Sequence, residues 1–368
     1  MNPIYGLLFL LFVFLGLPVS TGNAASSWSP WGPMEDITEA ARKEGALSIY
    51  RAPGHITVEG ERAISEAFLQ KFGIRVSWTS LGGMREMVPR ILTEQRTKQY
   101  VVDVAMAGFG PIYTTLKSKG YLLPILAPST LEKNVWRLDP ATATREDRNW
   151  LFINMALHSG FFVNTAIIPP GEEPQSYRDL LDSKWKGKVV MHDPGRGGPG
   201  MGWFRSVYKP LGLDYMKALA NQVTVLPRTN DAPDAVVRGQ YGVGVAISPT
   251  RGRQLIRQGA PVKFVVPKEG SYLSFQGIYA IVNAPHPNAA RLFLHWFFTR
   301  EGQELYARKT LAISVRKDVG QDHLPPDERY VEGQPYMMAD PADSMPARLK
   351  ELTALGKDIF AVAREKKQ

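Results

Sequence analysis

The residues best suited to chemistry in this sequence are glycines and arginines in short segments, and the chemistry they favour is the binding of a small anion. The first segment, DPGRGGPGMGW at residues 193–203, follows a predicted strand and leads into a predicted helix. Glycine lets backbone N–H groups approach a ligand, and the first turn of a helix favours negative charge. Arg196 adds a guanidinium group that binds a carboxylate or phosphate through paired hydrogen bonds. We predict ligand contacts from Arg196, Gly197 and Gly198 and an aromatic wall from Trp203; a flexible surface turn, and core packing for Trp203, are the alternatives.

Two further segments have the same character. Residues 80–83 (SLGG) combine a hydroxyl group with two glycines ahead of a predicted helix, although the serine is equally suited to capping that helix. Residues 248–253 (SPTRGR) also lead into a helix, and Arg251 and Arg253 stand only two positions apart, so we expect one of them to face the ligand and the other to face solvent. The candidates from these two segments are Ser80, Gly82, Gly83, Ser248 and Arg251.

A regular alternation of predicted strands and helices positions these segments. Three strand–loop–helix units come first, with strands predicted at residues 46–51, 74–79 and 101–106. Such alternation indicates a mostly parallel sheet, and ligands bind such sheets at the carboxyl ends of the strands. The loops at those ends are residues 52–58, 80–83 and 107–110, and they add four candidates, Gly54, His55, Gly108 and Phe109. A structural hydrogen bond is the alternative for the histidine, and core packing is the alternative for the phenylalanine.

A second block of alternating strands and helices begins near residue 160, and a further strand is predicted at residues 277–282. A chain of 368 residues is too long for one ordinary core, so we expect an α/β protein with two lobes. We divide it into a signal peptide at 1–24, a first lobe at 25–159, a second lobe at 160–274, and a return to the first lobe with a C-terminal helical tail at 275–368.

The N-terminus has the pattern of an export signal. Residues 1–24 carry no charged side chain, and Gly6–Leu17 is an apolar run of about a dozen residues, too short for a comfortable membrane span. The small residues Gly22-Asn23-Ala24 follow, so we predict cleavage near Ala24 and export to the periplasm. An uncleaved anchor is the alternative, since residues 1–5 (MNPIY) contain no lysine or arginine.

Composition excludes several classes of function. The net charge of +9 is spread along the chain without a basic run, so we expect no nucleic-acid partner. The sequence has no cysteine, which excludes disulfides, thiolate metal sites and a cysteine nucleophile.

Enzyme motifs are also absent. Residues 195–200 (GRGGPG) match a dinucleotide fingerprint formally, but Pro199 removes an N–H donor and Arg228 stands where NAD requires an acidic residue. The sequence has no G-x-S-x-G, no H-E-x-x-H and no P-loop, and its six histidines show no metal-binding spacing. We therefore expect no catalytic residues, no metal ligands and no cofactor.

Five stretches within residues 40–320 are similar to one known family. They are GFFVN at 160–164, DLLDSKWKGKV at 179–189, MHDP at 191–194, FFTREGQEL at 297–305 and SVRKDV at 314–319. These stretches resemble the family 1 extracellular solute-binding proteins of ABC importers, especially the ferric-iron branch. The resemblance implies a type II periplasmic binding protein fold, with two lobes joined by two crossing strands at a hinge and a ligand cleft between them. It also implies docking on a permease in the inner membrane, and it places His55 and Gln276 at the cleft.

The ferric members resembled here hold their metal with adjacent tyrosines in a loop of the second lobe. The corresponding stretch, GVAISPTRGR at 244–253, has arginines and no tyrosine, and cations do not suit a hard trivalent metal. We therefore predict a monomer that binds a small anionic organic solute: a phosphate ester, a phosphonate or a carboxylate. Ferric iron, a small organic cation, and a role as the ligand-binding subunit of a sensor kinase are the alternatives.

Overall fold

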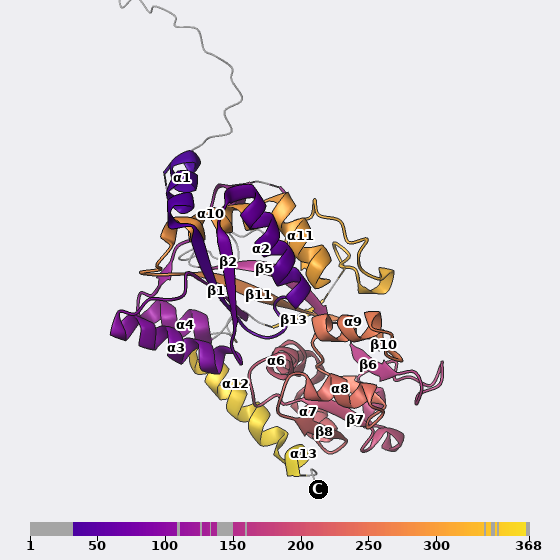
Figure 1. The fold of residues 1–368 in the computed structure, drawn as a ribbon. Helices are drawn as coiled ribbons and strands as arrows, with labels where there is room; N and C mark the ends of the chain where they lie inside the picture. The colour runs from indigo at the N-terminus through magenta and orange to yellow at the C-terminus, as the bar shows by residue number, and fades with distance from the viewer. Residues whose placement is uncertain are drawn as a thin grey trace, which may run out of the picture.

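The structure is a computed structural model that describes residues 32–365, except 109–110, 126, 133, 138–149, 159, 335, 340–342 and 344–345. The predicted signal peptide and its cleavage near Ala24 lie outside the described residues. Within this part of the chain, the strands form two separate sheets, each with its own helices, and these make two lobes (Figure 1). None of the helices it contains is long and apolar enough to cross a membrane.

The sheet of the first lobe has eight strands and a mixed direction. The strand β1 pairs in parallel with β2 and β3, whereas β11 pairs antiparallel with β3 and β5. The order is β12-β5-β11-β3-β1-β2, with β4 and β13 also paired to β11. The bounds are β1 Ala46–Arg51, β2 Arg75–Ser80, β3 Val104–Gly108, β4 Leu122–Leu123, β5 Trp150–His158, β11 Tyr272–Ile281, β12 Ile313–Ser314 and β13 Met337–Met338.

The sheet of the second lobe has five strands in the order β10-β6-β9-β7-β8. Here β7 pairs in parallel with β8 and β9, and β6 pairs antiparallel with β9 and β10. The bounds are β6 Phe161–Asn164, β7 Val189–His192, β8 Val223–Leu226, β9 Val243–Val245 and β10 Val262–Val265. The predicted α/β alternation is therefore present in both lobes, and antiparallel strands are added where the chain passes between them.

Helices cover both sheets, and their ends follow local rules. Thr57 caps α2 by accepting a hydrogen bond from Gly60 N–H, and Gly73 ends the same helix in the left-handed conformation. The helices of the first lobe are α1 Met34–Glu44, α2 Val58–Phe72, α3 Met84–Thr97, α4 Pro111–Ser118, α10 Pro287–Phe297 and α11 Arg300–Thr310. The remaining helices are α6 Pro199–Leu211, α7 Leu213–Ala220, α8 Asp231–Val237, α9 Pro249–Arg257, α12 Pro346–Ile359 and α13 Ala361–Glu365. Short 3₁₀ helices lie at η1 Pro128–Leu131, η2 Arg178–Leu181, η3 Ser183–Trp185 and η4 Pro326–Glu328.

Each lobe has its own aromatic core. In the first lobe the ring of Phe68 lies 5.4 Å from Phe293 and 5.5 Å from Trp296. In the second lobe Tyr177 lies 6.4 Å from Trp203, and both side chains are fully buried. Separate cores allow each lobe to move as a unit.

The chain passes between the lobes at two adjacent places. It leaves the first sheet after β5 and enters the second at β6, and it returns between β10 and β11. The two passages touch at Gly160, where an added Cβ would lie 2.3 Å from Cδ of Pro267. Gly160 also has a φ of 88°, so glycine is required there both for space and for backbone conformation.

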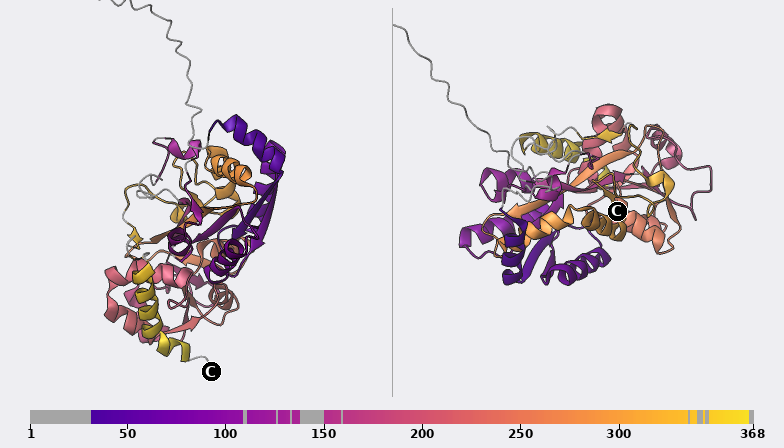
Figure 2. Two further views of the ribbon diagram at one scale, coloured as in Figure 1. Left: turned by 90° about the vertical axis from the view of Figure 1, so that its left-hand side faces the viewer. Right: turned by 90° about the horizontal axis from the view of Figure 1, so that it is seen from above.

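The C-terminal helices return to the second lobe after β13. Both α12 and α13 pack on α7, with further contacts from α12 to α6 and from α13 to β8. Figure 2 shows these two helices, coloured yellow, lying along the second lobe. The sequence predicted a helical tail without a location, and the structure places it here.

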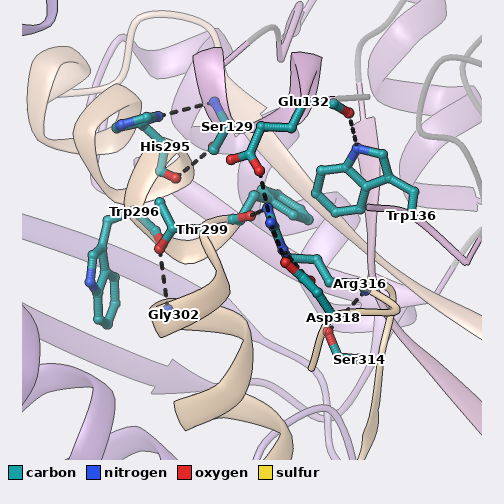
Figure 3. A network of polar contacts seen from close by, with 11 residues as sticks. Ser129, Glu132, Trp136, His295, Trp296, Thr299, Gly302, Ser314, Arg316 and Asp318 are labelled. Atoms are coloured by element: carbon teal, nitrogen blue, oxygen red, sulfur yellow. Dashed lines mark hydrogen bonds and ion pairs between the residues drawn. The ribbon is translucent and has the colours of Figure 1, made fainter. Parts of the chain in front are cut away.

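A polar network fixes the segment after β12 to the first lobe (Figure 3). The guanidinium of Arg316 is 3% exposed and donates to Glu132 and Asp318, at 2.8 Å each. It also lies over the ring of Trp136, 5.2 Å from its centre. Because its partners lie within the network, we assign Arg316 a structural role.

Candidate functional site

The carboxyl ends of three strands meet at one edge of the first lobe, as the alternation predicted. Arg51 at the end of β1 pairs with Ser80 in β2 and with Met106 in β3. The loops that follow these strands therefore lie side by side. Gln276 in β11 pairs with Gly108 and brings a neutral polar side chain to the same edge. Phe109 lies outside the described residues.

His55 and Gln276 present polar atoms without partners at this edge. Gln276 donates from Nε2 to the carbonyl oxygen of Gly54 at 3.1 Å. His55 is 8% exposed, and its Nδ1 lies 3.3 Å from the carbonyl oxygen of Pro53. Burial lowers the pKa of His55 to about 4, so the imidazole is neutral at pH 7. His55 Nε2 and Gln276 Oε1 are buried without a hydrogen-bond partner in the described part of the chain.

The second lobe has a corresponding edge. His192 at the end of β7 pairs with Leu226 at the end of β8, and Met191 pairs with Val245 at the end of β9. The loops at residues 193–198, 227–230 and 246–248 therefore share this edge. Sequence reasoning missed the loop after β8, although its position after a strand beside β7 was the signal that could have found it.

His192 is a second buried histidine, and it lies under the glycine-rich loop. Its Nδ1 accepts the N–H of Gly200 at 3.1 Å, so its proton is on Nε2. A Cβ added to Gly198 would lie 3.9 Å from that Nε2 and 3.6 Å from Oγ1 of Thr229. Burial lowers the pKa of His192 to about 4. His192 and Thr229 thus add neutral polar groups to the edge, and sequence reasoning had assigned neither of them.

The two edges face each other across the lobes and touch at two points. A Cβ added to Gly54 would lie 3.4 Å from the hydroxyl oxygen of Ser248, and one added to Gly197 would lie 3.7 Å from Cε of Met84. Candidate residues that are up to about 200 positions apart in the sequence are therefore neighbours. We call the loops at residues 52–57, 80–83, 193–198 and 246–248 the facing loops.

Four helices begin at the facing loops; Thr57 caps α2, whereas the other three have no side-chain cap. These three are α3 after Gly83, α6 after Gly198 and α9 after Ser248. The α6 helix begins at Pro199, inside the glycine-rich segment that was predicted to precede it, because proline suits the first helical turn. The first N–H groups of a helix carry partial positive charge, so these three ends favour an anion between the lobes.

Acidic side chains of the chain itself occupy part of this positive region. Gly82 N–H donates to the carboxylate of Glu86 at 2.5 Å. We had expected this donor to be free for a ligand, but Glu86 already occupies it. Arg196 is half exposed, and its Nε lies 3.3 Å from Oδ2 of Asp193. A ligand anion at these loops therefore competes with Glu86 and Asp193.

The other residues considered as ligand contacts are paired within the protein or buried. Arg251 donates to Oδ1 of Asp234 at 2.8 Å and keeps about a quarter of its side chain exposed. Arg253 is buried and pairs with Glu328 of the first lobe, so it does not face solvent. Trp203 is fully buried beside Tyr177 and is a core residue, not an aromatic wall.

A surface hollow of about 410 Å³ lies beside α3. Glu94 there accepts the hydroxyl of Tyr50 at 2.5 Å and the N–H of Val101 at 3.2 Å. Burial, together with Glu94, raises the pKa of Tyr50 to about 12. The lining residues are Pro89, Arg90, Thr93, Glu94, Thr97, Gln99 and Val101. This hollow therefore has the chemistry of a structural network.

Two lobes whose strand ends and helix N-termini face each other define a type II periplasmic binding protein fold, as the resemblance implied. The family model of the bacterial extracellular solute-binding proteins matches residues 63–330. The chain therefore belongs to that family of extracellular solute-binding proteins.

Several known proteins are similar over most of the chain. An uncharacterized protein of Haemophilus influenzae is 25% identical over 320 residues, which are 84% of this chain and 87% of that protein. The periplasmic binding protein AfuA of Actinobacillus pleuropneumoniae, with fructose-6-phosphate bound, has a TM-score of 0.70 at 22% identity, covering 86% of this chain and 99% of that one. Iron-bound HitA of Pseudomonas aeruginosa has a TM-score of 0.67 at 20% identity, covering 85% and 99%. The spermidine/putrescine-binding protein PotD of Streptococcus pneumoniae has a TM-score of 0.63 at 15% identity, covering 87% and 99%.

Proposed function

We propose that this protein captures a small anionic organic solute, such as a phosphate ester, a phosphonate or a carboxylate, and delivers it to the permease of an ABC importer. We further propose that it acts as an exported monomer in the periplasm, after cleavage near Ala24. The observation that carries the proposal is that three uncapped helices begin at facing loops of both lobes, one of which contains Arg196. Positive partial charges and a half-exposed guanidinium favour an anion over a cation.

The neutral groups at the facing loops favour an organic anion over an inorganic one. Among the residues that the structure describes, none is a partner of His55 Nε2 or Gln276 Oε1, and Ser248 adds a hydroxyl that does not cap its helix. A ligand that bears hydroxyl groups as well as its charge satisfies these atoms, whereas a bare inorganic anion leaves them unpaired. AfuA, whose structure contains fructose-6-phosphate, supports this class of ligand.

Similar proteins with other ligands require the alternatives to be tested. HitA is iron-bound and PotD belongs to a spermidine/putrescine transporter. In the part of the chain that the structure describes, no group of three or more His, Cys, Asp or Glu side chains is placed to hold a metal ion. Ferric iron and polyamines are therefore controls in the test below.

We infer that binding works by lobe closure at the passages beside Gly160. A ligand that contacts both sets of facing loops interacts fully only with the closed form, so it shifts the population toward closure. The permease then recognises the closed shape. This is a binding role and not a catalytic one.

The test begins with native mass spectrometry of the purified protein, which identifies any solute that co-purifies. Thermal unfolding is then followed with fructose 6-phosphate, methylphosphonate and citrate, and with fructose, spermidine and ferric citrate as controls. A true ligand at 100 times its Kd stabilises the fold by about 2.7 kcal/mol. Stabilisation by spermidine or by iron alone, with no effect of any organic anion, contradicts the proposal.

A further inference from the structure

The C-terminal helices are attached firmly to the second lobe. Phe360, between α12 and α13, is fully buried. Its ring lies 6.4 Å from Trp203 and 6.5 Å from Phe204 in α6. Leu352 and Ala363 are also fully buried in the same core. Residues 346–365 therefore form part of the lobe that carries the glycine-rich facing loop.

These helices also contact that loop directly. Arg364 in α13 donates from Nε to Oδ2 of Asp193 at 2.8 Å and from Nη2 to Oδ1 at 2.5 Å. Its Nη1 donates to the carbonyl oxygen of Lys357 at 2.6 Å, which fixes the guanidinium in place. Packing is close, because a Cβ added to Gly195 would lie 2.8 Å from Cα of Lys357.

Asp193 has two arginine partners, and they hold it unequally. Arg364 engages both carboxylate oxygens, whereas Arg196 reaches one of them through Nε at 3.3 Å. Burial raises the pKa of Asp193, but the hydrogen bonds from Arg364 and from the N–H of Gly195 outweigh it and lower that pKa. The carboxylate is 4% exposed and ionised, so it needs a cationic partner.

We propose that Arg364 is a positioning residue for ligand binding: it engages both carboxylate oxygens of Asp193 and so limits Arg196 to one contact through Nε, which leaves the terminal nitrogens of Arg196 to the ligand anion. The effect on ligand binding rests on the proposed function, whereas the contacts among Arg364, Asp193 and Arg196 do not depend on it. Without Arg364, the buried Asp193 carboxylate has Arg196 as its remaining arginine partner. Arg196 then engages Asp193 with its terminal nitrogens as well, so its positive charge compensates the carboxylate and is no longer offered to the ligand anion.

The first experiment measures binding by isothermal titration calorimetry with fructose 6-phosphate and inorganic phosphate as probes. Arg364→Gln weakens binding by roughly tenfold or more, as expected when a charge-assisted hydrogen bond to the ligand is lost. Adding Asp193→Asn to Arg364→Gln removes the competing charge and restores binding to within about threefold of the wild type. Lys350→Gln, which removes an exposed charge from α12, is the matched control and leaves binding unchanged.

The pattern separates positioning from a structural role. If Arg364 only supports the fold, Asp193→Asn removes one more contact and the double variant binds no better than Arg364→Gln alone. That result, or wild-type affinity in Arg364→Gln, overturns the inference.

A second experiment needs no ligand and so separates this inference from the proposed function. Phenylglyoxal modifies accessible guanidinium groups, and peptide mass spectrometry measures the rate at Arg196. The expected rate falls in Arg364→Gln, because the terminal nitrogens of Arg196 then also pair with Asp193, and recovers when Asp193→Asn is added. Equal modification rates at Arg196 in the wild type, in Arg364→Gln and in the double variant overturn the inference, even if the protein binds anions. The expected change in these rates, found together with no anion binding, refutes the proposed function alone.

Discussion

Replacing Arg253 with methionine is predicted to destabilise the protein strongly, because it removes one half of a buried ion pair between the lobes. Arg253 belongs to α9 of the second lobe, and its partner Glu328 belongs to η4; both side chains are 5% exposed or less. Arg253 also donates from Nη1 to the carbonyl oxygen of Leu311 at 2.9 Å. Removing one partner of such a pair leaves the other charge buried and costs about 3–5 kcal/mol.

Urea denaturation followed by tryptophan fluorescence measures this loss. The double variant Arg253→Met with Glu328→Met removes both charges, so we expect it to recover more than half of the lost stability. Arg251→Met is the matched control on the same helix. Its partner Asp234 is 30% exposed, and a surface pair of this kind contributes about 0–1 kcal/mol. Equal losses for Arg253→Met and Arg251→Met refute the reasoning.

Three other predictions follow from the same structure. Gly160→Ala places a Cβ 2.5 Å from the carbonyl oxygen of Val265, so we expect a loss of about 1–3 kcal/mol, seen as a lower Tm; an unchanged Tm refutes the close packing. His55 and His192 have folded pKa values of about 4 against the usual 6.5, so the unfolded chain takes up protons first as the pH falls. The free energy of unfolding should therefore drop from about pH 6.5 to pH 4, by up to ~3 kcal/mol per histidine. His192→Gln should remove the part of this pH dependence that His192 causes. An unaltered pH dependence in His192→Gln counts against burial of the neutral imidazole. Arg196→Ala should weaken anion binding by about 1.5–3 kcal/mol in titration calorimetry, and an unchanged Kd removes Arg196 from the site.

The local sequence predicted much of the fold. The strand at Ala46–Arg51 was predicted at the bounds the structure shows, and the strand predicted at residues 74–79 lies within one residue of β2, because hydrophobic spacing is a local signal. The strand β5 was not predicted. It is defined by antiparallel pairing with β11, more than a hundred residues later, and such pairing leaves little local pattern.

The sequence predicted which loops form the candidate site, but it did not predict how the charged side chains of these loops are paired. The prediction that strand-end loops of two lobes meet agrees with two contacts, of Gly54 with Ser248 and of Gly197 with Met84. The partners of the charged groups lie far away in the sequence: Arg364 reaches Asp193 across 171 positions. Side-chain pairing over such distances depends on tertiary packing, which spacing along the chain does not encode.

The central claim is that one anionic solute is held by the facing loops of both lobes at the same time. Hydrogen–deuterium exchange with and without the solute identified by mass spectrometry tests it most directly. We predict that the solute slows exchange together in residues 52–57 and 81–86 of the first lobe and in residues 194–201 and 248–252 of the second. Protection confined to one lobe, or located away from these loops, would contradict the claim.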